Sequence, residues 1–271
     1  MLGIIIYTPN TGADWPDAWQ QIEYARKGKL GLSLTNYDSD SLPAIASGSW
    51  AEVAGSIYKW TSEEAISGSP SANVINYIKL VPGGSGDTAY VTATWTDSAP
   101  TWSDAYQGYY DGTSRYVAGC YYDGTNYKLK WIYWNRDCGP INKYYSPPMV
   151  PGSLSSTNNY LQNYGSDLSI NTGYEVYMNV DLPSGAIITA FKSYPSASLT
   201  GIDLMRCALA DTTSAVMASS DDGSEDTSIT NPILDMESYF YMIYIINSTG
   251  SIKHIYGLRI QYTIIRRLPE P

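Results

Sequence analysis

The segment from Tyr109 to Tyr133, YYDGTSRYVAGCYYDGTNYKLKWIY, decides the fold of this chain. The unit YYDGT occurs in it twice, and each Asp-Gly pair supplies the positive φ that a tight hairpin turn requires. The residues Tyr116–Tyr122 between the two units have the composition of a strand. Leu129, Trp131 and Tyr133 then alternate with Lys128 and Lys130, which predicts a further strand with one apolar face. The segment predicts consecutive antiparallel hairpins.

Strand and turn signals continue toward the N-terminus. Trp50–Gly55 followed by Ser56–Trp60 predicts a hairpin, and Tyr77–Val81 and Tyr90–Trp95 predict strands. Thr61 and Glu64 have the spacing of a capping box, so Thr61–Ile66 is expected to form one helical turn that ends at Gly68.

The N-terminal forty residues contain a short predicted strand, Ile4–Tyr7, and the one strong helix pattern of the chain. Asp14 is a plausible N-cap with Pro16 in the first turn, and Gly28 ends the run. Trp15, Trp19 and Ile22 fall on one face of this helix. The stripe either packs on the core of the following module or attaches the chain to other proteins, and the sequence leaves both open.

The C-terminal part has clean strand alternation. Tyr174, Val176, Met178, Val180 and Leu182 share one predicted face, and Ile202, Leu204 and Ala208 oppose Asp203, Met205 and Cys207. In the last strand Ile252, His254, Tyr256, Leu258, Ile260, Tyr262 and Ile264 are expected to point the same way. Tyr239–Ile246 is apolar at every position, which predicts a central strand covered on both faces.

We therefore predict a mostly β protein, with an antiparallel β module followed by a C-terminal β-sandwich or jelly-roll-like domain and one short N-terminal helix. The expected divisions are an attachment arm over 1–40, the module over 41–134, a Pro- and Tyr-rich linker over 135–168 and the sandwich over 169–271. Pro140, Pro147, Pro148 and Pro151 make regular strand hard to sustain in the linker.

Composition excludes several classes of function. The net charge of −10 lacks the basic footprint that a nucleic-acid binder needs. No apolar run approaches the length of a membrane span, and Gly3–Tyr7 is too short for a secretory signal, so maturation in the cytoplasm is expected. Cys120, Cys138 and Cys207 have neither metal-site spacing nor an even count, which favours reduced thiols, with a Cys120–Cys138 bridge as the alternative. The 26 Tyr and 8 Trp against 2 Phe suit strand surfaces, subunit interfaces or sugar stacking.

No catalytic signature is present. His254 is the only histidine, and a hydrogen-bonded structural role on the last strand is expected for it. The acidic residues Asp221, Asp222, Glu225 and Asp226 surround Gly223 without the ordered spacing of a calcium loop, so a solvated loop is favoured over a metal site. We expect no enzyme activity, no cofactor and no metal. A polysaccharide-cleaving enzyme that uses two carboxylates is the weakest alternative.

Four stretches of the module together resemble a known family. Pro43–Ser49, Glu52 to Gly68, Tyr77–Pro82 and Ala99–Asp111 are similar to the start, the E-V-x-G segment, the Y-I-K-L-V-P strand and the A-P-T-W-x-D-A-x-Q-G-x-Y-D segment of bacteriophage tail-fibre and related virion-appendage proteins. More loosely, Tyr174–Thr189, Tyr239–Ile245 and Gly257–Thr263 resemble C-terminal sandwich domains of phage fibres and bacterial surface proteins.

The resemblance implies a virion structural protein. Its expected features are a homotrimer, attachment to other virion proteins through the N-terminal region and a head that contacts a host-surface glycan or protein. A soluble carbohydrate-binding module that uses the same Tyr and Trp surface is the alternative function.

Overall fold

The protein consists of antiparallel β-sheets, as predicted. The computed structural model describes residues 4–7, 30–84, 89–133, 136–148, 153–154, 167–211, 213–248 and 250–266, and these ranges contain strands and no helix. The predicted helix with Trp15, Trp19 and Ile22 lies outside them. No membrane-spanning helix occurs in these ranges. Two compact units are present, Met1–Gly139 with Arg266–Pro271, and Pro140–Ile265.

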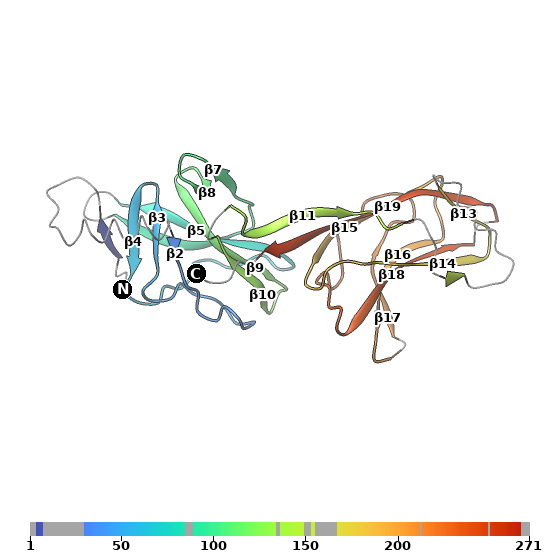
Figure 1. The fold of residues 1–271 in the computed structure, drawn as a ribbon, viewed down its shortest axis with the longest axis horizontal. Coiled ribbons are helices and arrows are strands. Elements are labelled where there is room, and N and C mark those ends of the chain that lie inside the picture. Colours follow the sequence, from blue (N-terminus) through green and yellow to red (C-terminus); the bar gives the residue numbers. More distant parts are fainter. Residues whose placement is uncertain are drawn as a thin grey trace. The chain divides into compact units, whose positions relative to one another are not determined.

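The first unit is a sandwich of two sheets (Figure 1). One sheet has the order β1-β4-β3-β2, formed by Ile4–Tyr7, Ser56–Trp60, Trp50–Val53 and Leu30–Gly31. The second has the order β6-β5-β9-β8-β7, with β10 also paired to β9. Its strands are β5 (Val74–Gly83), β6 (Tyr90–Thr96), β7 (Thr101–Ser103), β8 (Gly108–Asp111), β9 (Ser114–Tyr122) and β10 (Tyr127–Ile132).

One apolar core joins these two sheets. Ala51, Tyr58 and Trp60 from the first sheet pack with Ile78, Leu80 and Val117 from the second. Strands β1 and β2 come from the predicted arm and pair with β4 and β3. The described part of the arm therefore belongs to this sandwich.

Both YYDGT units form the predicted turns. Gly112 has φ 59° between β8 and β9, where Asp111 pairs with Ser114. Gly124 has φ 97° between β9 and β10, and the Asp123 carboxylate accepts the backbone N–H groups of Thr125 and Asn126.

An aromatic layer covers the face of the six-stranded sheet that points away from the shared core. Trp131 and Tyr116 contact Tyr77 edge-on, and all three side chains are buried. Tyr133 extends the layer to Tyr109, with ring centroids 4.3 Å apart. Most of the aromatic side chains in this layer therefore complete a core rather than line a surface.

Two predictions for the module are wrong. Thr61–Ile66 forms no helical turn, because Glu64 exchanges both backbone hydrogen bonds with Ile45 at 2.9 Å and is held extended. The alternation of Lys128 to Tyr133 is broken by a bulge at Leu129, whose φ is 52°. Lys130 consequently turns inward, is buried, and its Nζ donates to the carbonyl of Ser39.

The second unit is also a sandwich. One sheet has the order β11-β19-β13, with β15 also paired to β19; the other has the order β12-β14-β18-β16-β17. The strands of the first are β11 (Gly139–Tyr145), β13 (Leu168–Ile170), β15 (Ile187–Pro195) and β19 (Lys253–Arg266). Those of the second are β12 (Ser153–Leu154), β14 (Tyr174–Asn179), β16 (Gly201–Ala208), β17 (Ser214–Ser219) and β18 (Tyr239–Asn247). The predicted faces of β14 and the start of β16 are confirmed, since Val176, Met178, Ile202 and Leu204 enter the core between the sheets.

Strands β11 and β12 lie inside the segment 135–168, where we expected a linker without regular strand. That expectation is wrong for Gly139–Tyr145, because β11 joins the sheet beside β19. A proline is tolerated where a strand begins, and Pro140 stands at the second position of β11.

The predicted single face of β19 is also wrong in its first half. Ser193 pairs with Leu258 and Pro195 with Ile255, so β19 carries one extra residue over this interval. Such a bulge exchanges the two faces of a strand. Ile255 therefore points into the core, while Ile252 and Tyr256 are 58% and 60% exposed.

Candidate functional site

The outer face of the sheet β14-β18-β16 carries the best candidate site of the described residues. Strand β18 is central, as predicted, because it pairs with β14 and with β16. Its residues alternate, however: Tyr241, Ile243 and Ile245 are buried in the core, whereas Met242, Tyr244 and Ile246 are half-buried on the other face. The prediction that both faces are covered is therefore wrong, and an apolar and aromatic surface remains open.

Two tyrosines and one carboxylate form the centre of this face. Tyr177 on β14 stands opposite Tyr244 on β18, with ring centroids 5.3 Å apart and a 36° angle between the rings. The two hydroxyl groups donate to the two carboxylate oxygens of Glu175, at 2.8 Å and 2.9 Å. Each ring is thus fixed at its far end, and the pair forms a preorganised platform.

A second carboxylate extends the same row across the sheet. Asp203 on β16 stands opposite Tyr244, and on its other side it stands opposite Ser219 of β17. The hydroxyl of Ser219 donates to Asp203 Oδ1. The row Tyr177, Tyr244, Asp203 and Ser219 therefore places two aromatic rings beside two hydrogen-bonding side chains.

The tyrosine hydroxyls of this face remain donors over the physiological pH range. Burial, followed by the hydrogen bond to Glu175, raises the pKa of Tyr244 to about 12. The hydrogen bond to Glu175 is the main cause that raises the pKa of Tyr177. Aromatic surface with a few oriented polar groups is the usual composition of a small-ligand site.

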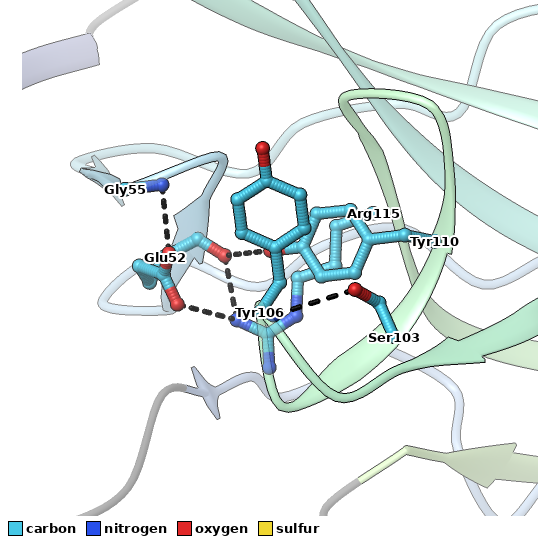
Figure 2. Close-up of polar contacts among 6 residues, drawn as sticks. All are labelled: Glu52, Gly55, Ser103, Tyr106, Tyr110 and Arg115. Carbon is cyan, nitrogen blue, oxygen red and sulfur yellow. Dashed lines mark hydrogen bonds and ion pairs between the residues drawn. The ribbon is translucent and has the colours of Figure 1, made fainter.

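A buried polar cluster in the first unit is the second candidate (Figure 2). Arg115 on β9 donates to the backbone carbonyl of Glu52 at 2.5 Å, and its Nη1 lies 3.9 Å from Glu52 Oε2. The hydroxyl of Tyr110 donates to the same carbonyl at 3.3 Å, and the N–H of Gly55 donates to Glu52 Oε1 at 2.7 Å. Both charged side chains are buried. This cluster therefore links the two sheets and does not form a surface for a ligand.

His254 has the structural role that the sequence predicts, on the opposite face of β19 from the one expected. Its Nδ1 lies 2.6 Å from Asp167 Oδ2 and 3.0 Å from Ser169 Oγ. A serine-hydrolase triad needs the serine on one ring nitrogen and the carboxylate on the other. Here both groups contact the same nitrogen, so this arrangement does not match an activated serine.

The acidic residues around Gly223 serve local structure. The carboxylate of Asp221 accepts the N–H of Ile202, and Asp222 accepts that of Ser224. Asp226 accepts N–H groups from Ser219 and Ser228, and Glu225 pairs with Arg259 at 3.1 Å. Within the ranges that the structure describes, no three His, Cys, Asp or Glu side chains gather as metal ligands. The three cysteines are buried and form no disulfide in the structure.

Sequence reasoning assigned no role to Glu175, Tyr177 and Tyr244. A signal was present, because the alternation that places Val176 and Met178 in the core places Glu175 and Tyr177 outside. The register that sets Tyr177 opposite Tyr244 joins residues far apart in the chain and has no local signature. The predicted attachment residues Trp15, Trp19 and Ile22 are outside the described ranges.

Comparisons with known proteins give limited similarity. No protein-family model matches the chain. A polyhydroxybutyrate depolymerase from Talaromyces funiculosus is 30% identical over 138 residues, which cover 49% of this chain and 38% of that protein. This chain therefore spans well under half of that relative. A low-affinity xylan-binding module, CBM86 from Roseburia intestinalis, is structurally similar over 46% of this chain and 96% of its own, with 5% identity and a TM-score of 0.25.

Proposed function

We propose that this protein is a non-catalytic carbohydrate-binding protein, and that the outer face of β14, β18 and β16 holds the sugar. The observation that carries the proposal is the half-exposed pair Tyr177 and Tyr244, fixed by the single carboxylate of Glu175. Sugar rings present C–H groups that pack on aromatic faces and hydroxyls that exchange hydrogen bonds with carboxylates. This face offers both kinds of partner side by side.

The polar groups of the face retain capacity for a ligand. A carboxylate has about four lone-pair sites. Glu175 accepts two tyrosine hydroxyls, and Asp203 accepts one serine hydroxyl. The remaining acceptor positions are available to sugar hydroxyls. A single site on so open a surface would bind weakly, and several copies acting together would raise the overall affinity.

The test is binding of the full chain to an array of neutral polysaccharides, followed by calorimetry with a soluble fragment of the best ligand. Tyr177→Ala and Tyr244→Ala should each weaken binding about tenfold, which corresponds to about 1.4 kcal/mol. Tyr90→Ala, which removes an exposed tyrosine from β6 in the other unit, is the matched control and should bind like the wild type. Equal binding by all variants would place the site elsewhere.

The same assay tests the absence of catalysis. Because the similarity to the depolymerase covers only 38% of that protein, its activity is not carried over to this chain. Reducing-end release from the bound glycan, or release of hydroxybutyrate from a poly(3-hydroxybutyrate) film, would contradict the non-catalytic proposal.

The family resemblance of residues 43–134 supports a broader proposal for the biological role of this protein. In it, the protein is part of a bacteriophage appendage that displays the binding face to a host-surface glycan or protein. The quoted stretches fall within one sandwich, where Tyr77–Pro82 lies in β5 and Ala99–Asp111 contains the hairpin β7-β8. The resemblance thus concerns one sandwich apart from β1 and β2, which precede residue 43. In this setting the protein is a homotrimeric virion component that is assembled in the host cytoplasm.

Attachment through Trp15, Trp19 and Ile22 is the matching proposal for the N-terminal region. Deleting residues 1–40 would also remove β1 and β2, which pair with β4 and β3, so point substitutions are the cleaner test. Trp15→Ala combined with Trp19→Ala should reduce the protein in purified particles and leave glycan binding unchanged. Undiminished incorporation, or a monomer in sedimentation at micromolar concentration, would contradict this setting.

A further inference from the structure

We propose that the opposite sheet of the second unit carries a separate binding face for an anionic polysaccharide, one whose sugars bear carboxylates. The face is formed by Tyr144 on β11, Arg259 on β19, and Lys192 and Tyr194 on β15. It lies on the other sheet from Tyr177 and Tyr244 and does not depend on them.

Cationic and aromatic side chains are interleaved on this face. The guanidinium carbon of Arg259 lies 5.3 Å from the ring centroid of Tyr144 and 6.0 Å from that of Tyr194. Lys192 Nζ lies 5.5 Å from the Tyr194 centroid. Lys192 and Arg259 are direct partners in the register of β15 and β19, so the two charges stand next to each other. Cation–π contacts of this length hold both charges against the rings.

Both tyrosine rings and the charge of Arg259 are accessible to solvent. Tyr144 is 63% exposed and Tyr194 is 38% exposed. The Arg259 side chain is 36% exposed. The ring of Tyr194 lies over Gly257, where an added Cβ would be 3.6 Å from the ring, so no side chain stands between the ring and the strand. Because both rings are exposed, a sugar ring can approach them from solvent.

The charge of this face is opposite to that of the whole chain, whose net charge is −10. Arg259 pairs with Glu225 at 3.1 Å, and Lys192 makes no ion pair within the described ranges. A guanidinium has five N–H donors, and the pair with Glu225 uses one of its nitrogens. Carboxylates of a ligand can thus bind both Lys192 and the remaining donors of Arg259.

The small number of cations on this face selects the class of ligand. A nucleic acid needs a basic surface that neutralises several phosphates, whereas this face supplies only Lys192 and Arg259. A neutral glycan could accept hydrogen bonds from the two cations but would not neutralise their charge. A polymer of uronic acids carries one carboxylate on each sugar ring. Its sugar rings can pack on Tyr144 and Tyr194 while its carboxylates bind the neighbouring cations of Lys192 and Arg259.

The experiment is affinity electrophoresis and calorimetry of the full chain with polygalacturonate and alginate oligosaccharides, with xylan and dextran as neutral probes. Arg259→Gln and Lys192→Gln should each weaken uronate binding about tenfold, because each removes a charge-assisted hydrogen bond. Glu225→Gln should instead strengthen it several-fold, since it frees Arg259 and removes a repelling charge. Binding should weaken as salt is raised from low to physiological concentration.

Two controls separate this site from simpler causes. Lys143→Gln removes an exposed charge one residue from Tyr144, on the other side of β11, and should leave uronate binding unchanged. The double variant Tyr177→Ala/Tyr244→Ala should also retain it. No uronate binding by the wild type, a loss in Lys143→Gln equal to that in Arg259→Gln, or weaker binding by Glu225→Gln would each overturn the proposal.

Discussion

Arg115 donates to the backbone carbonyl of Glu52 while its guanidinium also faces the carboxylate of the same residue, so one side chain binds both parts of another (Figure 2). Glu52 is on β3 and Arg115 on β9, which belong to the two different sheets of the first sandwich. The pair is buried, and burial lowers the pKa of Arg115. A buried charge is tolerable only while its partner is present.

Arg115→Met should therefore lower the free energy of unfolding by about 3–5 kcal/mol, because it leaves the Glu52 carboxylate without its cation. The double variant with Glu52→Gln should recover part of that loss. Lys79→Met is the control, since its pair with the exposed Asp111 is a surface contact at 3.4 Å, and such pairs contribute about 0–1 kcal/mol. Urea unfolding measures all three, and equal effects of Arg115→Met and Lys79→Met would refute the inter-sheet role.

Gly119→Ala tests the aromatic layer. An added Cβ would be 2.2 Å from the Trp131 ring and 2.6 Å from the backbone oxygen of Asn76. Overpacking of this kind costs about 1–3 kcal/mol. Gly257→Ala, whose Cβ would meet nothing closer than 3.6 Å, should change stability by less than about 0.5 kcal/mol. Thermal unfolding of the two variants compares them, and similar melting temperatures would mean that Trp131 does not occupy this space.

Stability should fall steeply in alkali. Burial is the main cause that raises the pKa of Tyr77 and of Tyr110 to about 12, from an ordinary value of 10.0. Above pH 10 the unfolded chain releases these protons while the folded chain keeps them, so the unfolded state is favoured as the pH rises toward about 12. Each such tyrosine costs up to about 1.4 kcal/mol per pH unit in this window. Urea midpoints measured at several pH values should show this, and Tyr77→Phe should flatten the dependence.

Glu175→Gln should change the pKa values of the two tyrosines of the candidate site, Tyr177 and Tyr244, to different extents. The hydrogen bond to Glu175 is the largest cause of the raised pKa of Tyr177, whereas burial is the largest cause for Tyr244. Removing the negative charge should therefore lower the pKa of Tyr177 toward its ordinary value and leave that of Tyr244 clearly raised. A tyrosine-labelled NMR titration resolves the two, and an unchanged Tyr177 would show that Glu175 does not hold it.

Local patterns in the sequence predicted most strands correctly. The Asp-Gly turns at Gly112 and Gly124 and the alternation of β14 depend on neighbouring residues, and these predictions are confirmed. The failures at Lys130 and in β19 have one cause in common, a bulge. A bulge shifts the faces of a strand by one residue without leaving a distinctive residue type, so periodicity alone misplaces every side chain beyond it.

The other incorrect or missing predictions depend on pairing between residues far apart in the sequence. Glu64 is extended because of Ile45, a residue that the capping-box spacing does not include. The same holds for the candidate site, since Tyr177 and Tyr244 meet only through the register of β14 with β18. The sequence showed which strands are rich in aromatic side chains, but not which of these side chains would share a face.

The extra residue of β19 between Ile255 and Leu258 also matters for tracing the ancestry of this chain. An alignment scored on hydrophobic alternation would match Tyr256 with core positions of relatives whose strand runs straight. A one-residue gap placed between Ile255 and Leu258 aligns core positions with core positions both before and after the bulge. The degree of similarity measured over the second unit therefore depends on where that gap is put.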